Sequence, residues 1–67
     1  MKVYIRWCGD PEDYEQSLLS VHATRESAET AIRKYENEEG EFFQTSRNPV
    51  WRFAMTNSYI TEEELLP

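Results

Sequence analysis

Residues 17–40 read SLLSVHATRESAETAIRKYENEEG, and a change of hydrophobic period within them decides the predicted fold. In residues 17–23 apolar and polar side chains alternate, which is typical of a strand with one buried face. The apolar residues then recur at i, i+3, i+4 and i+7, the spacing of one helix face; they are Ala28, Ala31, Ile32 and Tyr35. Thr24 is expected to cap the start of this helix, and Gly40 to end it.

The segments on either side of this unit predict further strands. Residues 2–8 alternate, while residues 41–45 and 50–57 predict a short strand and a longer one, separated by turn residues at 46–49. The predicted element order is β-β-α-β-β, an α+β domain with one helix packed on one face of an antiparallel sheet of three to four strands. We expect the long last strand to pair with the first one, which would make the first strand central.

The alternation also predicts which side chains face the helix. The inner face is expected to hold Val3, Ile5, Trp7, Leu19, Val21, Trp51, Phe53 and Met55. The outer face is expected to carry Tyr4, Arg6, Leu18, His22 and Arg52. An outer face of this kind is either solvated or a recognition surface, since Tyr and Arg are enriched at interfaces.

The C-terminal residues carry a local helix signal. Thr61 and Glu64 have the spacing of a capping box, flanked by Ile60 and Leu65 at the positions of a hydrophobic staple. The remaining length allows about one helical turn, so a frayed tail is the alternative. The sequence therefore predicts a single α+β domain over residues 1–59, followed at 60–67 by an acidic tail or a single helical turn.

Length and composition bound the function. The 67 residues include 13 acidic and 7 basic side chains, for a formal net charge of −6. One small domain is expected, and the charge argues against direct binding of nucleic acid. The single Cys8 excludes an intramolecular disulfide and fits a reducing compartment, so we expect a cytoplasmic protein. No apolar run approaches the ~20 residues of a membrane span, and Arg6 interrupts any signal-peptide core.

Eleven of the thirteen carboxylates fall into three clusters, which are Asp10, Glu12, Asp13 and Glu15; Glu36, Glu38, Glu39 and Glu41; and Glu62, Glu63 and Glu64. Such clusters either keep a protein soluble or bind a partner. As a binding surface, the first two clusters would imitate the spaced charge of a phosphate backbone and steer the chain to a basic groove. Tyr14, inside the first cluster, would be the aromatic anchor.

Motifs for catalysis, metals and cofactors find little support. Cys8 and His22 could be cross-strand neighbours, but no third group that would orient such a pair is evident. The acidic loop lacks the calcium-loop register, no His or Cys spacing fits zinc, and two glycines form no phosphate loop. The aromatic set of Trp7, Trp51 and Phe53 could stack bases, but its shared period favours core packing. We therefore expect no enzyme, no cofactor and no metal site.

Two stretches, MKVYIRW at residues 1–7 and SVHATRESA at residues 20–28, resemble small acidic phage-encoded and prophage-encoded proteins of β-β-α-β type. Some proteins of that kind are anti-CRISPR or other anti-defence inhibitors. The resemblance covers residues 1–40, and its motif is a strand followed by a capped helix. It implies a protein-binding inhibitor in the host cytoplasm that occludes a basic nucleic-acid-binding surface, in the manner of a DNA mimic.

Two other functions remain open at the sequence level. One is an interaction module or homodimer that uses the outer sheet face, with Tyr4, Arg6, His22 and Arg52 as its contacts. The other is a sponge for a small anionic nucleotide signal, which would require the arginines to converge in a pocket.

Overall fold

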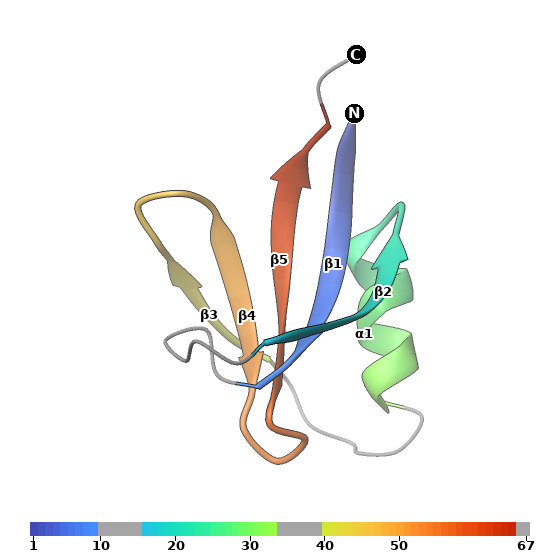
Figure 1. Cartoon of the computed structure of the whole chain (residues 1–67), viewed down its shortest axis with the longest axis vertical. Coiled ribbons are helices and arrows are strands. Elements are labelled where there is room, and N and C mark those ends of the chain that lie inside the picture. Colours follow the sequence, from blue (N-terminus) through green and yellow to red (C-terminus); the bar gives the residue numbers. More distant parts are fainter. Residues whose placement is uncertain (10–15, 34–39, 66–67) are drawn as a thin grey trace.

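The computed structural model describes residues 1–9, 16–33 and 40–65. Its elements are β1 (Lys2–Cys8), β2 (Ser17–His22), α1 (Arg25–Arg33), β3 (Glu41–Gln44), β4 (Pro49–Phe53) and β5 (Ser58–Glu64). The strands form one antiparallel sheet in the order β2-β1-β5-β4-β3, with α1 beside its β1–β2 end (Figure 1). The predicted α+β class is confirmed, with a short helix and with five strands where three to four were expected.

The fifth strand is the largest departure from the sequence prediction. β5 occupies residues 58–64, where a helical turn or tail was expected from residue 60, and it lies at the centre of the sheet. It pairs with β1 along its whole length, from Lys2↔Glu64 to Cys8↔Ser58, and with β4 on its other side. A capping interaction contributes only ~0.5–2 kcal/mol. Two hydrogen-bonded ladders and the burial of Ile60 outweigh that local signal, so the capping-box prediction is wrong.

A turn explains why the expected long strand at 50–57 is wrong as well. β4 ends at Phe53, and the backbone N–H of Asn57 donates to the Ala54 carbonyl at 3.2 Å. Asn57 has a φ of 48°, a left-handed conformation that Asn tolerates better than most residues. The turn sends the chain back as β5, which therefore takes the place beside β1 that the alternation predicted for residues 50–57.

The side chains that face the helix are only partly the predicted ones: β4 presents the expected face to α1, whereas β1 presents the opposite one. Its core cluster consists of Ala28, Ile32, Trp51, Phe53 and Ile60, with Tyr4 packed against it. Because β5 lies between β1 and β4, Trp51 is in register with Ile60, and Ile60 is in register with Arg6. Side chains of a strand alternate between faces. Trp51 and Phe53 therefore share a face with Tyr4 and Arg6 rather than with Val3, Ile5 and Trp7.

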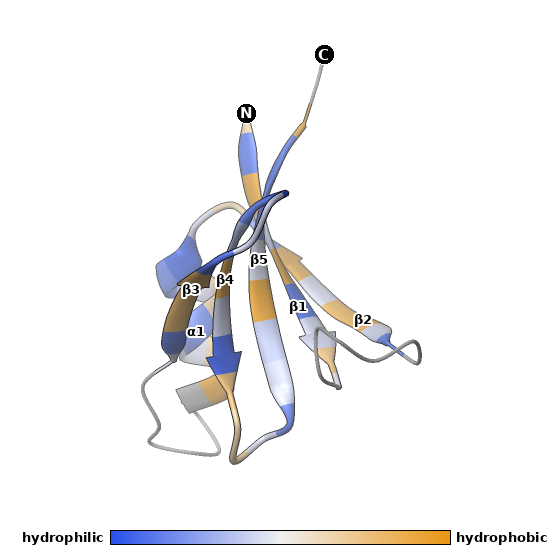
Figure 2. Ribbon diagram, turned by 90° about the vertical axis from the view of Figure 1, so that its left-hand side faces the viewer, coloured by the Kyte–Doolittle hydropathy of each residue, from blue (hydrophilic) through white to orange (hydrophobic). Residues whose placement is uncertain are grey.

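Three other predicted core residues are exposed. Leu19 and Val21 on the edge strand β2 are 49% and 55% exposed, and Met55 lies in the turn after β4 at 71%. Figure 2 shows β2 at one side of the sheet with several apolar segments. The expected inner face thus mixes residues from both faces of the sheet and from a turn.

The start of α1 follows the sequence prediction. Thr24 Oγ1 accepts a hydrogen bond from the backbone N–H of Ser27 at 3.1 Å, so Thr24 is the N-cap. Ala28 and Ile32 are fully buried on the face that α1 turns to the sheet. The expected position of Tyr35 lies outside the described residues. Gly40 lies so close to Phe53 that a Cβ atom there would be 2.6 Å from Cζ of the ring, so a larger residue at this position would displace the ring.

Candidate functional site

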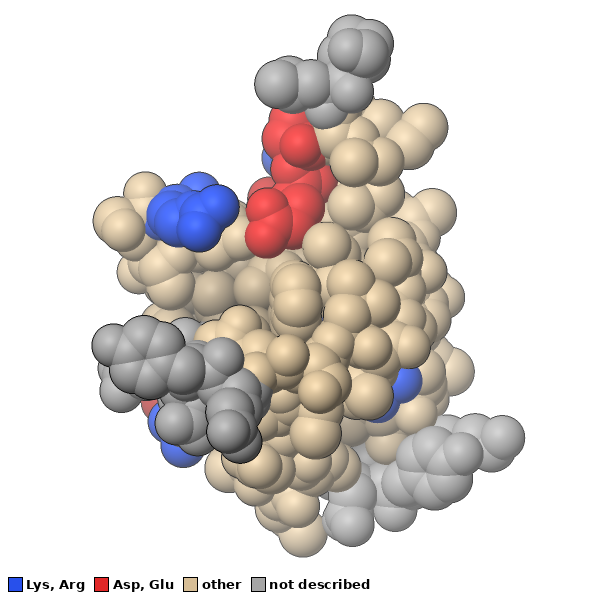
Figure 3. Space-filling view, in the orientation of Figure 1, with Lys and Arg blue, Asp and Glu red and all other residues tan. Residues whose placement is uncertain are grey.

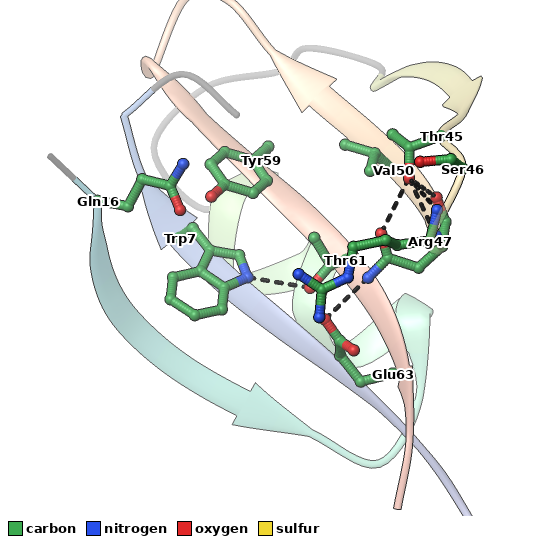
Figure 4. Close-up of a pocket in the computed structure, with 10 residues that line it drawn as sticks. Trp7, Gln16, Thr45, Ser46, Arg47, Val50, Tyr59, Thr61 and Glu63 are labelled. Atoms are coloured by element: carbon green, nitrogen blue, oxygen red, sulfur yellow. Dashed lines mark hydrogen bonds between the residues drawn. The ribbon is translucent and has the colours of Figure 1, made fainter. Parts of the chain in front are cut away.

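A hollow of about 490 Å³ lies on the sheet face that α1 leaves uncovered (Figure 4). We call it the helix-free hollow. Its described lining consists of Trp7 from β1, Val50 from β4, Tyr59, Thr61 and Glu63 from β5, Gln16 before β2, and Thr45, Ser46, Arg47 and Asn48 from the β3–β4 turn. The volume is within the ~300–1,000 Å³ range of ligand pockets.

The floor of the hollow is aromatic and held in place. The rings of Trp7 and Tyr59 stack with centroids 6.1 Å apart and an angle of 14° between their planes. Trp7 Nε1 donates a hydrogen bond to Thr61 Oγ1 at 2.9 Å, which fixes the orientation of the indole. Tyr59 and Val50 are 3% and 2% exposed. The floor is therefore formed before any ligand arrives, which lowers the entropy cost of binding.

The wall is the β3–β4 turn, which is fixed internally and to β5. Thr45 Oγ1 accepts hydrogen bonds from the backbone N–H groups of Arg47 and Asn48, at 3.2 and 3.0 Å. The side-chain amide of Asn48 donates to Glu63 Oε1 at 2.8 Å. This bond ties the turn across to β5, so the wall and the floor form one unit.

The rim carries both signs of charge. Arg47 is exposed on the turn and forms no ion pair within the described residues, while Glu63 faces the same hollow from β5. Figure 3 shows carboxylates gathered near the free end of β5 and a basic group beside them. An apolar floor with a few polar groups at its edge is the usual composition of a binding hollow.

The third acidic cluster, at the end of β5, is engaged within the chain. Glu62 accepts a hydrogen bond from the Tyr4 hydroxyl at 2.9 Å and lies 3.7 Å from Lys2 Nζ. Glu64 pairs with the N-terminal ammonium group at 3.2 Å. The hydrogen bond to Glu62, together with burial, raises the pKa of Tyr4, because both favour the neutral phenol.

Most of the predicted acidic contact residues lie outside the described residues; they are Asp10, Glu12, Asp13, Tyr14, Glu15, Glu36, Glu38 and Glu39. Glu41 is described and is exposed at the start of β3. The role of the first two clusters in binding therefore stays a prediction.

The four residues expected to share the outer sheet face are divided between the two faces. Tyr4, Arg6 and His22 lie on the side that α1 covers, whereas Arg52 is in register with Tyr59 on the helix-free side. His22 is held between Ser20 Oγ at 2.7 Å and Ser27 Oγ at 2.9 Å. Arg6 Nε is buried without a hydrogen-bond partner among the described residues. The single recognition face predicted from alternation is not formed, because β5 sets a different register.

Most lining residues were not predicted to make contacts; they are Gln16, Thr45, Ser46, Arg47, Asn48, Val50, Tyr59 and Thr61. A signal for two of them was present, since Ser58-Tyr59-Ile60-Thr61 is rich in the aromatic and β-branched residues that strands favour. The capping-box pattern at the same place masked it. Nothing local predicts that the turn with Arg47 would face β5.

Among the described residues we find neither a Cys–His pair in contact nor a cluster of metal ligands. Cys8 pairs with Ser17 and His22 pairs with Tyr4, so Cys8 and His22 lie at opposite ends of the β1–β2 ladder. Residues 1–9, 16–33 and 40–65 contain no group of three His, Cys, Asp or Glu side chains placed to hold a metal ion. Over the same ranges no helix has the length and apolar character needed to cross a membrane.

The arginine side chains that the structure describes do not converge. Arg25 lies over the Trp51 ring at 4.9 Å from its centroid, and Arg6 and Arg52 belong to opposite faces of the sheet. Arg47 is the one arginine among the described lining residues of the hollow. The pocket that a sponge for an anionic nucleotide would need is therefore not found in the described part of the chain.

No protein-family model matches this chain, and neither the curated proteins nor the solved structures include a match to it.

Proposed function

We propose that this chain is a small non-enzymatic protein-binding module that is attracted to a basic partner surface and receives one large apolar side chain of that partner in the helix-free hollow. The observation that supports this proposal is the preformed floor of Trp7 stacked on Tyr59, on a sheet face that the helix leaves open. A second hollow has no aromatic residue in its described lining, which is Lys2, Arg47, Asn48, Pro49, Glu62, Glu63 and Glu64.

The hollow suits an anchor residue. A few buried aromatic or aliphatic side chains carry most of the free energy of protein association, and they lie in pockets that exclude water. Trp7, which is partly exposed, offers such a side chain a flat apolar surface, and the buried ring of Tyr59 packs against the indole and supports it. Because Thr61 already holds the indole of Trp7, little side-chain freedom is lost on binding.

Charge favours a partner with a basic surface. A net charge of −6 on 67 residues attracts such a surface over long range. At the rim, the Glu63 carboxylate can accept hydrogen bonds from a Lys or Arg beside the anchor residue. Arg47, on the other side, disfavours a second cation there. Binding should therefore weaken as salt is added.

Inhibition of a host defence or nucleic-acid-handling protein is the form of this function that the resemblance to phage-encoded proteins implies.

A second candidate function is direct contact of the carboxylate clusters with the partner, without any contribution from the hollow. The observation that favours it is the run Glu62, Glu63 and Glu64, which gathers three carboxylates on one strand end. The partners that these carboxylates already have within the chain make it the weaker candidate.

A displayed library of random peptides tests the proposal before any partner is identified. Peptides selected on the immobilised chain should share one large apolar or aromatic residue flanked by Lys or Arg. Their affinity should fall between about 0.1 M and about 1 M NaCl, where the screening length shortens from ~10 to ~3 Å. Selection of no peptide, or of acidic peptides only, would contradict the proposal.

Two matched variants locate the binding site. Ser46→Trp places an indole on the wall of the hollow, whereas Ala54→Trp places one in the turn after β4, outside the lining. Both replaced side chains are small and exposed, so both variants should fold. Ser46→Trp should weaken the selected peptide at least about tenfold, which is ~1.4 kcal/mol, and Ala54→Trp should not.

Charge reversal separates contact by the first acidic cluster from contact by the hollow. Asp10→Lys, Glu12→Lys and Asp13→Lys together should abolish binding if the first acidic cluster makes the contact. If the hollow makes the contact, the triple reversal should lower the association rate and its salt dependence while the dissociation rate changes little. Equal sensitivity to Ser46→Trp and Ala54→Trp would contradict the hollow.

A further inference from the structure

β2 differs from every other strand in its charge. It contains no Lys, Arg, Asp or Glu, whereas β1, β3, β4 and β5 each contain at least one. It also contains no Pro, and within the described sheet no strand pairs with its outer edge. Natural proteins protect such edges with charges, especially Lys, or with Pro. β2 has neither charge nor Pro. Its one irregularity is a bulge opposite Arg6 and Trp7, and on both sides of this bulge its outer row of backbone N–H and C=O groups is open to another strand.

The side chains of β2 are apolar and exposed. Leu18, Leu19 and Val21 are 53%, 49% and 55% exposed, although strands of soluble proteins normally bury such residues or replace them on the solvent side. Leu18 is in register with Trp7 and Val21 with Ile5, so both lie on the helix-free face. A bulge at Leu19 brings them to the same side.

We propose that β2 is a dimerisation edge, where a second copy of this chain adds its own β2 in antiparallel orientation and extends the sheet across a two-fold axis. In this arrangement Leu18 lies opposite Val21 of the second copy, and symmetry repeats the pair. Opposite residues of antiparallel strands point to the same face. The pairing therefore removes apolar side chains of both copies from water on the helix-free side.

Charge favours this edge over the other edge for contact with a second copy. Two chains of charge −6 repel each other, and they approach at least cost where the contact strand itself is uncharged. The other edge, β3, starts with Glu41, so self-pairing there would bring a carboxylate of each acidic copy into the contact. In a two-fold symmetric dimer each copy contributes the same surface, so that surface has to be complementary to itself. A neutral apolar strand meets this requirement.

The interface is small, so the dimer should form at high concentration and dissociate on dilution. β2 has six residues, and contacts that bury less than ~1,200 Å² are usually transient. Salt should strengthen the dimer, because it screens the repulsion between the two acidic chains. Binding of a basic partner should weaken with salt, so the dimer and the proposed function can fail independently.

Sedimentation velocity tests the dimer from micromolar to millimolar concentration, at about 0.1 M and about 1 M NaCl, with reductant present so that Cys8 stays a thiol. We expect a monomer–dimer equilibrium that shifts to dimer with concentration and with salt. A monomer under all of these conditions would overturn the proposal, and so would a dimer that salt dissociates.

Edge variants assign the interface. Val21→Lys and Leu18→Lys each place a charge at an exposed position of β2 and should raise the dissociation constant of the dimer at least about tenfold. Phe42→Lys is the matched control, since Phe42 is 55% exposed on the opposite edge strand, and it should leave the dimer unchanged. Loss of the dimer in Phe42→Lys with retention in Val21→Lys would overturn the assignment.

Hydrogen exchange of the unmodified chain provides a readout that needs no variant. Backbone amides within Ser17–His22 should exchange more slowly at high than at low concentration, while those of β3 should not change. The absence of any concentration dependence in β2 would contradict the dimer. If the chain stays monomeric and the selected peptides protect β2, the edge accepts a foreign strand and the second copy is excluded.

Discussion

The two faces of the sheet are built from the same strands, but only one of them is covered by the helix. On the helix-covered face, Ala28, Ile32, Phe53 and Ile60 have at most 1% of their surface exposed. On the helix-free face, a buried floor around Tyr59 is bordered by side chains as exposed as Val21 at 55%. In so short a chain one layer of helix can cover one face only. Val3, Val50, Tyr59 and Thr61 are also buried on the helix-free face, so both faces supply stability. Only the exposed border of the helix-free face remains available for contacts.

The largest expected effect is on the helix-covered face. Phe53→Ala removes a fully buried ring from the core cluster and should lower the free energy of unfolding by about 3–5 kcal/mol. Urea unfolding followed by circular dichroism measures it. Phe42→Ala, at an exposed position, is the control and should cost clearly less. A loss below about 1 kcal/mol for Phe53→Ala would show that this face is not the core.

Gly40→Ala should have the next largest effect on the free energy of unfolding. The added Cβ would lie 2.6 Å from Cζ of Phe53, so the ring has to move within a packed core. Overpacking of this kind costs about 1–3 kcal/mol. The cost should shrink when Phe53→Leu removes the distal ring atoms, which a double-mutant cycle from urea unfolding detects. Additive effects of the two substitutions would contradict the contact.

On the helix-free face, Thr61→Val should cost about 1 kcal/mol of stability, because Trp7 Nε1 loses its acceptor. Thr61→Val should weaken peptide binding more, for each kcal/mol of stability lost, than Phe53→Ala does. The reason is that the indole of Trp7 is no longer held in its orientation. Urea unfolding and the affinity for a selected peptide measure the two effects. Unchanged affinity would show that the orientation of Trp7 does not matter for the hollow.

The smallest effect concerns pH. The pKa of Tyr4 is raised above its ordinary value of 10.0, mainly by the hydrogen bond to Glu62. The folded state therefore holds this proton more tightly than the unfolded state. The resulting stability is fully present below pH 10 and is lost as pH rises through the folded pKa. Urea unfolding from about pH 9 upward should show a decline that is shallower in Tyr4→Phe; equal slopes would contradict the shift.

The sequence correctly predicted α1, β1 and β2, because the residues that specify each of them are close together in the sequence. Thr24, Ala28 and Ile32 specify the cap and the buried face of α1 within a few residues of each other. β1 and β2 likewise follow from their own alternation. The end of β4 at Phe53 was not predicted, because apolar and polar residues continue to alternate beyond it. The left-handed conformation of Asn57, which forms the turn, leaves no mark in that alternation.

The position of β5 could not be predicted from neighbouring residues. Its local pattern, Thr61 to Glu64, favours a helix, and the strand forms because β1 pairs with it along its whole length from the other end of the sequence. That single placement decides which face Trp7 occupies and hence where the hollow lies. One wrong element therefore reversed the predicted face of β1 relative to that of β4, while the fold class stayed right.

The most direct test of the division between the two faces is a set of backbone and indole ¹H–¹⁵N shifts, recorded as a library-selected peptide is added. We expect shift changes at Trp7 Nε1–H and at the amides of Arg47 and Thr61, with Ala28 and Ile32 unchanged. Changes centred on α1, or confined to the carboxylate clusters with Trp7 unaffected, would contradict this expectation.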